Sequence, residues 1–174
     1  MPATFIVLLH GPMGSGKTTT SKLLHEQFVP SARVALPDLR RLVSGNHREH
    51  ADITRDIMLE MTDVYLVKGV PVIVEVVCQA PYIAKYKELA AKHDCVFLPY
   101  YISADEALRF DRVCERTRQM LDVAILPESK KEELQTIFTE NATFYACLEG
   151  ELGTSLDTTN LTPEQVVSEI KTTV

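Results

Sequence analysis

The sequence contains no tryptophan, only seven glycines and four cysteines, and no positive net charge. Its 174 residues carry a formal charge of -6 at pH 7, so the chain as a whole repels phosphate backbones. This net charge does not exclude a local basic groove. No C-x-x-C pair and no His at a zinc-ligand spacing accompanies the cysteines, which predicts reduced, mostly packed thiols. These cysteines are Cys78, Cys95, Cys114 and Cys147.

Long apolar runs are also missing. The run from Phe5 to Leu9 is too short to cross a bilayer, and no cationic segment of the kind found in signal peptides precedes it. No internal repeat or Gly/Ser linker divides the chain. With 45% hydrophobic and 24% charged residues, the composition is typical of a folded protein. We therefore expect a single domain over residues 1–174, located in the cytoplasm and without a membrane partner.

Short runs of Val, Ile and Leu alternate with longer stretches of helical spacing. We expect strands at Thr4–His10, Arg33–Leu36, Pro71–Val76, Cys95–Ile102 and Thr154–Leu156. We expect helices near Lys17–Phe28, Arg48–Val67, Pro81–His93, Ala104–Met120, Lys130–Cys147 and Pro163–Thr172. This order predicts an α/β fold with a mainly parallel five-stranded sheet, helices on both faces, and a ligand at the carboxyl ends of the strands.

Two helix starts carry capping signals. Ser103 and Glu106 have the spacing of a capping box, in which the serine oxygen accepts a backbone N–H and the glutamate reaches back. Thr162 and Gln165 repeat this pattern, with Pro163 at the first helical position, where a missing N–H costs nothing. Both segments are therefore predicted to open helices.

The segment from Gly11 to Thr18, G-P-M-G-S-G-K-T, satisfies the phosphate-binding pattern G-x-x-x-x-G-K-[ST] known as Walker A. It follows the apolar run Phe5 to Leu9 and opens a predicted helix, which is the strand, loop and helix context that the motif requires. Glycines allow the backbone N–H groups to converge on a triphosphate. The segment therefore predicts a P-loop.

Within this loop, the helix dipole and two side chains have separate roles. Lys17 supplies a positive charge to the β- and γ-phosphates, and Thr18 places a hydroxyl where it can bind Mg²⁺. We predict ATP and Mg²⁺ as the cofactors. The residues assigned to ATP binding are Gly11, Pro12, Met13, Gly14, Ser15, Gly16, Lys17, Thr18 and Thr19.

The rest of the chain narrows the class of P-loop protein. No N-K-x-D tetrapeptide occurs, so a guanine-nucleotide switch is not expected. The third strand ends in a single glutamate, Glu75, where motor and transporter ATPases have Asp or Asp-Glu. Glu75 either holds a water on Mg²⁺ or orients the acceptor; the alternative is a strand-end carboxylate that faces solvent or pairs with an arginine.

The segment P-D-L-R-R starting at Pro37 follows the second predicted strand and so lies at the edge of the sheet that carries the P-loop. Asp38 is the candidate base, because a carboxylate there can accept the proton of an attacking hydroxyl. Arg40 or Arg41 would bind an anionic group of the acceptor. Asp38 is equally suited to cap a helix.

Arginines concentrate between residues 109 and 118 of an otherwise acidic chain. Arg109, Arg112 and Arg116 share one face of a helix, and that face can close over ATP and stabilise the transferred phosphoryl group. The alternative is a solvent-exposed helix whose arginines form ion pairs with acidic neighbours on the same helix. The following stretch, Leu121 to Glu133, is predicted to be a mobile connection between two helices, so residues from about 109 to 133 form a candidate lid.

Together these residues resemble the zeta-toxin, chloramphenicol phosphotransferase and polynucleotide kinase-like group of P-loop kinases. The matching segments are the P-loop from Gly11, P-D-L-R-R from Pro37, the R-x-x-x-R of Arg112 and Arg116, and L-D-T-T-N-L-T-P-E-Q-V from Leu156. They span nearly the whole chain.

This resemblance implies a three-layer P-loop NTPase fold and a role for each matching residue. Asp38 is then the general base, Arg41 contacts the acceptor, and Arg112 and Arg116 belong to a lid over the phosphates. The turn from Asp157 to Asn160 is then expected to border the adenine. No signature for a particular acceptor follows the P-loop.

The leading prediction is a kinase that transfers the γ-phosphate of ATP to a hydroxyl of a small molecule or nucleotide. A polynucleotide 5′-hydroxyl kinase is a rival that needs stacking aromatic residues beside a basic groove; its candidates are Tyr82, Tyr86, Tyr100 and Tyr101. Nucleic acid is therefore a possible partner but not the favoured one. A regulatory ATP-binding module and a toxin-type kinase for a cell-wall precursor sugar are further alternatives.

Overall fold

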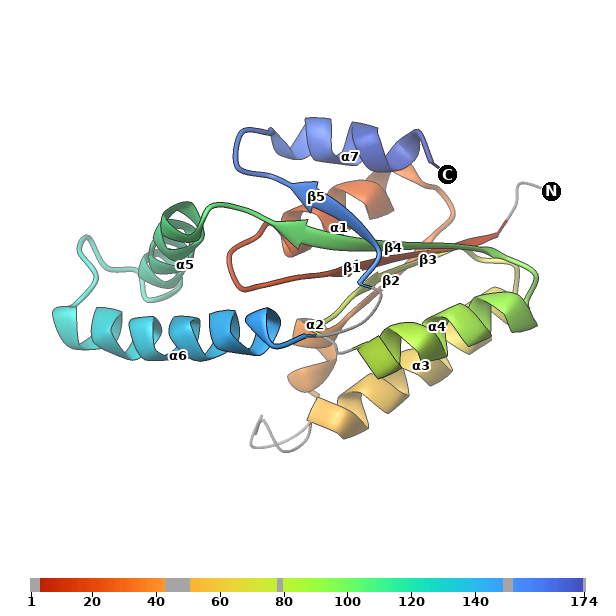
Figure 1. The fold of residues 1–174 in the computed structure, drawn as a ribbon, viewed down its shortest axis with the longest axis horizontal. Coiled ribbons are helices and arrows are strands. Elements are labelled where there is room, and N and C mark those ends of the chain that lie inside the picture. Colours follow the sequence, from red (N-terminus) through yellow and green to blue (C-terminus); the bar gives the residue numbers. More distant parts are fainter. Residues whose placement is uncertain (1–3, 43–50, 78–79, 149–151, 174) are drawn as a thin grey trace.

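A computed structural model describes residues 4–42, 51–77, 80–148 and 152–173. Its parallel strands form one sheet in the order β2-β3-β1-β4-β5 (Figure 1). The strands are β1 Phe5–His10, β2 Ala32–Ala35, β3 Val72–Glu75, β4 Val96–Ser103 and β5 Thr154–Asp157. The predicted α/β fold with a five-stranded parallel sheet is confirmed.

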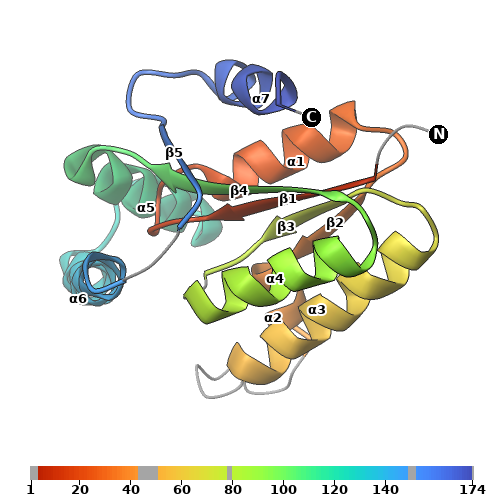
Figure 2. The ribbon, with the colours of Figure 1, turned by 45° about the vertical axis from the view of Figure 1, so that its right-hand side comes forward.

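Helices cover both faces of this sheet and extend past one end of it. Over the described residues they are α1 Lys17–Gln27, α2 Leu36–Arg40, α3 Ala51–Val67, α4 Ala80–Lys92, α5 Glu106–Met120, α6 Glu128–Ala146 and α7 Pro163–Lys171. Helices α1 and α7 lie on one face, and α3 and α4 lie on the other (Figure 2). Helices α5 and α6 lie beyond the carboxyl ends of the strands, where a ligand is expected.

Strand β1 separates two hydrophobic cores because its side chains alternate between the faces of the sheet. Ile6 and Leu8 contribute to the core under α3 and α4, whereas Phe5, Val7 and Leu9 contribute to the core under α1 and α7. All of these side chains are buried. A strand that is apolar on both faces is typical of the centre of a parallel sheet.

A third core joins α5 to α6. Val113 of α5 packs with Leu134 and Phe138 of α6, and the side chain of Met13 packs against this cluster. Phe110 and Phe138 also make an edge-to-face contact, with ring centroids 5.3 Å apart. Since Met13 belongs to the predicted P-loop, the two helices are attached to that loop by apolar contacts.

The structure corrects three local predictions. Helix α2 begins at Leu36, a residue predicted to end a strand. Asp105, and not Ser103, caps α5: its carboxylate accepts the N–H groups of Ala107 and Leu108. Helix α6 begins at Glu128, two residues before its predicted start at Lys130, so residues 128–133 of the predicted mobile connection form its first turns. The connection between α5 and α6 is therefore shorter than the sequence suggested.

Other local predictions are confirmed. The capping box of Thr162 and Gln165 opens α7. Cys95, Cys114 and Cys147 are free thiols as predicted. Cys95 and Cys114 are half-buried and pack against hydrophobic cores, whereas Cys147 is exposed, contrary to the expectation of packed thiols. Cys78 lies outside the described residues. The predicted helix start at residues 48–50 also lies outside them. In the part of the chain that the structure describes, no helix combines the length and apolar character needed to cross a membrane.

We expect Leu24→Ala to lower the free energy of unfolding by about 2–5 kcal/mol, because it leaves a cavity between α1 and the sheet. Leu24 is fully buried, with 0% of its surface exposed. The matched control is Leu42→Ala, since Leu42 is 80% exposed and should change stability by less than ~0.5 kcal/mol. Urea unfolding measures both; equal midpoints for the two variants would contradict the proposed core.

Candidate active site

The P-loop connects β1 to α1 and opens toward the carboxyl ends of the strands. Gly16 precedes α1 in a left-handed conformation, with φ 97° and ψ 0°, and no side chain caps the helix there. The first N–H groups of a helix have no acceptor within the helix, so this turn presents free donors to an anion. A Cβ on Gly14 would lie 2.3 Å from the carbonyl oxygen of Arg109, which explains the glycine at that position.

The outer side of the loop is held by residues from distant parts of the chain. The N–H of Gly11 donates to the hydroxyl of Tyr145 at 3.1 Å, and the N–H of Met13 donates to Oδ1 of Asn141 at 2.6 Å. Thr158 is buried, and its hydroxyl lies 3.0 Å from the carbonyl oxygen of Ser15. These contacts shape the loop before any ligand arrives.

Asn141, Tyr145 and Thr158 were not among the predicted site residues. Polar residues on a helix or at a strand end are common, and nothing in the sequence links them to a loop more than 120 positions away. Their contacts with the loop depend on how α6 and β5 pack beside it. Thr158 does fall within the predicted turn from Asp157 to Asn160.

Lys17 lies at the centre of the site. Its Nζ donates to the carbonyl oxygen of Pro12 at 2.7 Å and to Oγ of Ser15 at 3.3 Å. Burial lowers the pKa of Lys17 from its ordinary value to about 8; Glu75 opposes this shift, whereas Arg116 and Arg109 add to it. Glu75 therefore offsets only part of the cost of burying the ammonium charge. A bound phosphate would supply a further negative charge beside it.

Glu75 ends β3 and is almost completely buried, with 2% of its surface exposed. Its carboxylate accepts the hydroxyl hydrogen of Thr18, a very short contact, and that of Ser21 at 2.7 Å. It also pairs with the guanidinium of Arg33 at 2.5 Å. Pairing with an arginine was one of the interpretations left open by the sequence, and exposure to solvent was wrong. Glu75 and Thr18, the two predicted metal ligands, are in direct contact.

Asp38 lies in α2 at the same end of the sheet. Its carboxylate pairs with Arg33 at 2.7 Å, and 54% of its side chain is exposed. Asp38 does not cap the helix, because the residue at the cap position is Ala35. Arg41, the predicted acceptor contact, is exposed at the end of α2.

The arginines of α5 divide into three environments. Arg112 donates to the carbonyl oxygen of Gly14 at 3.4 Å, and the exposed Arg116 faces the same hollow. Arg109 is buried instead, with its guanidinium 4.9 Å from the ring centre of Phe138. It does not form one open face with the other two, as helical spacing had predicted. Arg118 pairs with Glu115 at 2.6 Å outside the cleft.

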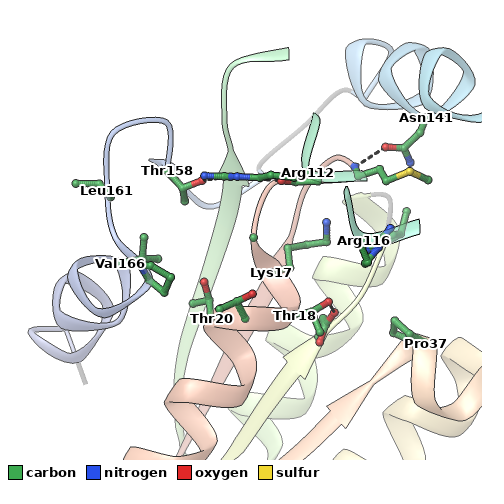
Figure 3. A pocket seen from close by; sticks show the side chains of 17 residues that line it. Lys17, Thr18, Thr20, Pro37, Arg112, Arg116, Asn141, Thr158, Leu161 and Val166 are labelled. Carbon is green, nitrogen blue, oxygen red and sulfur yellow. Dashed lines mark hydrogen bonds between the residues drawn. The ribbon is translucent and has the colours of Figure 1, made fainter. Parts of the chain in front are cut away.

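These side chains surround a cleft of about 610 Å³ (Figure 3). Lys17 and Thr18 stand in its middle, with Pro37 on one side and Leu161 and Val166 on the other (Figure 3). The predicted site residues in its lining are Met13, Gly14, Gly16, Lys17, Thr18, Thr19, Glu75, Arg112 and Arg116. The remaining predicted ones, Gly11, Pro12, Ser15, Asp38 and Arg41, are not part of that lining.

The cleft thus has three parts. Its centre is cationic and rich in backbone donors, because the P-loop meets α5 there. The end beside β5 and α7 is apolar, whereas Glu75 lines the end beside β3 and is joined through Arg33 to Asp38 outside the lining. The cationic centre thus lies between an apolar end and an acidic one.

A parallel sheet with a glycine-rich loop after its central strand, a lysine in that loop and arginines above it define a P-loop kinase-like, nucleotide-binding protein. A family model described as an AAA domain matches residues 6–140. The chain belongs to this family. Among curated protein sequences, none matches it.

Solved structures share the fold at low sequence identity. A candidate kinase from Chloroflexus aurantiacus J-10-fl superposes with a TM-score of 0.71 and 13% identity, covering 99% of this chain and 99% of its own. The tunicamycin resistance protein of Deinococcus radiodurans superposes with a TM-score of 0.58 and 18% identity, covering 98% of this chain and 95% of its own. A gluconokinase from Sinorhizobium meliloti 1021 superposes with a TM-score of 0.58 and 20% identity, covering 97% of this chain and 89% of its own. The predicted resemblance to P-loop kinases is confirmed at the level of fold.

We expect the affinity for ATP to fall as the pH rises above 8. A lysine pKa lowered to about 8 means that Lys17 of the free protein is charged below this pH and neutral above it. The attraction to phosphate is therefore complete below pH 8 and declines about tenfold per pH unit above it. Calorimetric titrations between pH 7 and 9.5 measure this slope.

The control is Lys17→Arg, since arginine stays protonated throughout this range. Whatever its affinity at pH 7, this variant should lose little more by pH 9.5. A wild-type affinity that is flat to pH 9.5 would contradict the lowered pKa.

Proposed function

We propose that the protein is an ATP-dependent phosphotransferase that moves the γ-phosphate of ATP to a hydroxyl group of a small molecule or nucleotide. The observation that supports this most is Asp38. Its carboxylate is half exposed and is anchored by Arg33, which also pairs with Glu75 in the lining of the P-loop cleft.

In this reaction Asp38 accepts the proton of the acceptor hydroxyl. The hydroxyl oxygen then forms a bond to the γ-phosphorus while the bond from this phosphorus to the β–γ bridging oxygen breaks, and ADP leaves.

The cytoplasm, which supplies ATP, is the proposed compartment. Arg41, exposed at the end of α2, is proposed to bind an anionic group of the acceptor.

Three cations would stabilise the charge on the transferred group. Lys17 contacts the β- and γ-phosphates from below, and Arg112 and Arg116 contact them from α5. In the free protein Arg112 binds the carbonyl oxygen of Gly14 at the long distance of 3.4 Å, a contact that it can exchange for a phosphate oxygen.

The residues near Thr18 fit Mg²⁺, which prefers oxygen ligands and usually takes only one or two from the protein. The hydroxyl of Thr18 and the carboxylate of Glu75 are in contact with each other. Thr18 would hold the ion directly and Glu75 would accept a hydrogen bond from one of its waters. Bound there, Mg²⁺ would neutralise part of the charge of the phosphates.

The apolar end of the cleft suits the nucleoside part of the phosphate donor. Leu161, Pro163 and Val166 line it, and Thr158 lies between them and the P-loop. We assign adenine to this end, in agreement with the absence of N-K-x-D from the sequence.

A small acceptor agrees better with the described surface than a polynucleotide does. Tyr86 and Tyr100 are 1% and 5% exposed, so neither can stack on a base. The ring of Tyr82 is covered by Lys85, 4.7 Å from its centre. The gluconokinase that shares this fold also acts on a small molecule.

We expect Asp38→Asn to lower turnover by about two to four orders of magnitude while ATP binding is retained, because it removes the base and keeps the P-loop. The assay screens small hydroxyl compounds and nucleotides for transfer from γ-labelled ATP. Lys17→Ala is the blank. Asp94→Asn is the matched control: Asp94 is exposed at the opposite end of the sheet with a φ of 49°, which asparagine tolerates.

Transfer by Asp38→Asn at the wild-type rate would remove Asp38 from the mechanism. Tight ATP binding without transfer to any acceptor would favour a regulatory ATP-binding module instead.

We expect Arg112→Ala and Arg116→Ala each to lower kcat by about 10²–10³-fold and to change the Kd for ATP much less, because these contacts strengthen as charge moves in the reaction. Arg118→Ala is the control, since its partner is Glu115 outside the cleft. Steady-state kinetics and ATP titrations on the three variants measure the difference. A larger effect on Kd than on kcat would assign these arginines to ground-state binding.

A further inference from the structure

Arg33 uses all of its nitrogen positions on residues at the site. It comes from β2, and only 12% of its side chain is exposed. Its Nε donates to Oγ of Ser21 at 2.8 Å, one terminal nitrogen donates to Asp38 at 2.7 Å, and the other donates to Glu75 at 2.5 Å. One guanidinium thus joins α1, α2 and β3.

These partners fix the direction of the guanidinium. Ser21 also donates to Glu75 at 2.7 Å, so Arg33, Ser21 and Glu75 close a ring of hydrogen bonds. Because the guanidinium is planar, fixing two of its nitrogens fixes the third. The nitrogen that faces Asp38 is therefore directed by the buried end of the network.

Asp38 needs such an anchor. It lies in a helix of five residues, and its side chain is more than half exposed. A freely rotating carboxylate would be within reach of an acceptor hydroxyl only part of the time, and a general base must stay within hydrogen-bonding distance. Two carboxylates beside a triphosphate also repel it and each other, and the charge of Arg33 offsets part of that repulsion.

We infer that Arg33 is a positioning residue that holds Asp38 at a set place relative to Glu75 and Thr18, and so couples the acceptor end of the cleft to its metal-binding end. This inference rests on the proposed phosphotransferase. Arg33 acts through Asp38 and does not itself touch the reacting atoms.

The first test is Arg33→Lys. Lysine keeps a positive charge beside the buried Glu75 but has a single nitrogen, which cannot serve three partners in three directions. We expect kcat to fall by about 10- to 100-fold, because displacement of a catalytic group by about 1 Å has effects of this size. The KM values for ATP and acceptor should stay within about threefold. Arg118→Lys, which alters an arginine–glutamate pair outside the cleft, should leave all three values unchanged.

The decisive test is a double-mutant cycle with Asp38→Asn. If Arg33 acts by positioning the base, Arg33→Lys should cost less than about threefold in kcat once the base is gone. An undiminished loss in the Asp38→Asn background overturns the inference, as does an unchanged kcat in the single variant. A general structural defect would lower kcat equally in both backgrounds, so the cycle separates the two explanations.

Thermal unfolding would reveal whether Arg33→Lys fails to fold. In that case a second variant tests the same inference. Ser21→Ala removes the acceptor of Nε and one donor to Glu75, and leaves both ion pairs of Arg33 in place. We expect a smaller loss of kcat, about three- to tenfold, which again disappears in the Asp38→Asn background. Additive losses would overturn the inference here too.

The failure of the inference differs from the failure of the proposed function. If wild type transfers no more phosphate than Lys17→Ala, both fall together. If wild type transfers phosphate and the cycle is additive, the phosphotransferase stands and the positioning role of Arg33 does not.

Discussion

The carboxylate of Glu75 is buried at the end of β3, and a buried carboxylate must be offset by donors and positive charge. Thr18 and Ser21 supply donors from α1, and Arg33 supplies the charge from β2. This requirement draws the start of the P-loop helix toward the neighbouring strands. It also leaves one nitrogen of Arg33 free for Asp38, so the same network extends from the P-loop helix to the exposed carboxylate of α2.

The other side of the P-loop is supported by a different kind of contact. Met13 inserts its side chain among the apolar residues of α5 and α6, while its N–H donates to Asn141. Gly14 lies against the backbone of Arg109 too closely for any side chain. The loop is thus held between an ionic network and a small hydrophobic core. The helices predicted to form a lid are packed onto the loop itself, and Arg112 and Arg116 line the same cleft as the loop.

Prediction from sequence succeeded where the signal was local. The P-loop, the strand run after which it comes and the capping box of Thr162 each depend on residues within a few positions of one another, and each is found in the structure. Prediction failed where a residue's role depended on its neighbours in space. Arg33 was the lone charge in a predicted strand, a signal that could have marked it, yet its partners are 5, 12 and 42 positions away. Arg109 had the spacing of an open face and is buried against Phe138.

The same distinction separates what each level decided about this protein. The amino-acid sequence by itself determined the fold class and the phosphate loop, because hydrophobic periodicity and glycine-dependent backbone geometry are local properties. Only the tertiary structure decided which carboxylate is buried, which is exposed, and which arginine joins them. Burial and ion pairing depend on where the ends of separate strands and helices meet, and in a parallel sheet those ends come from distant parts of the chain.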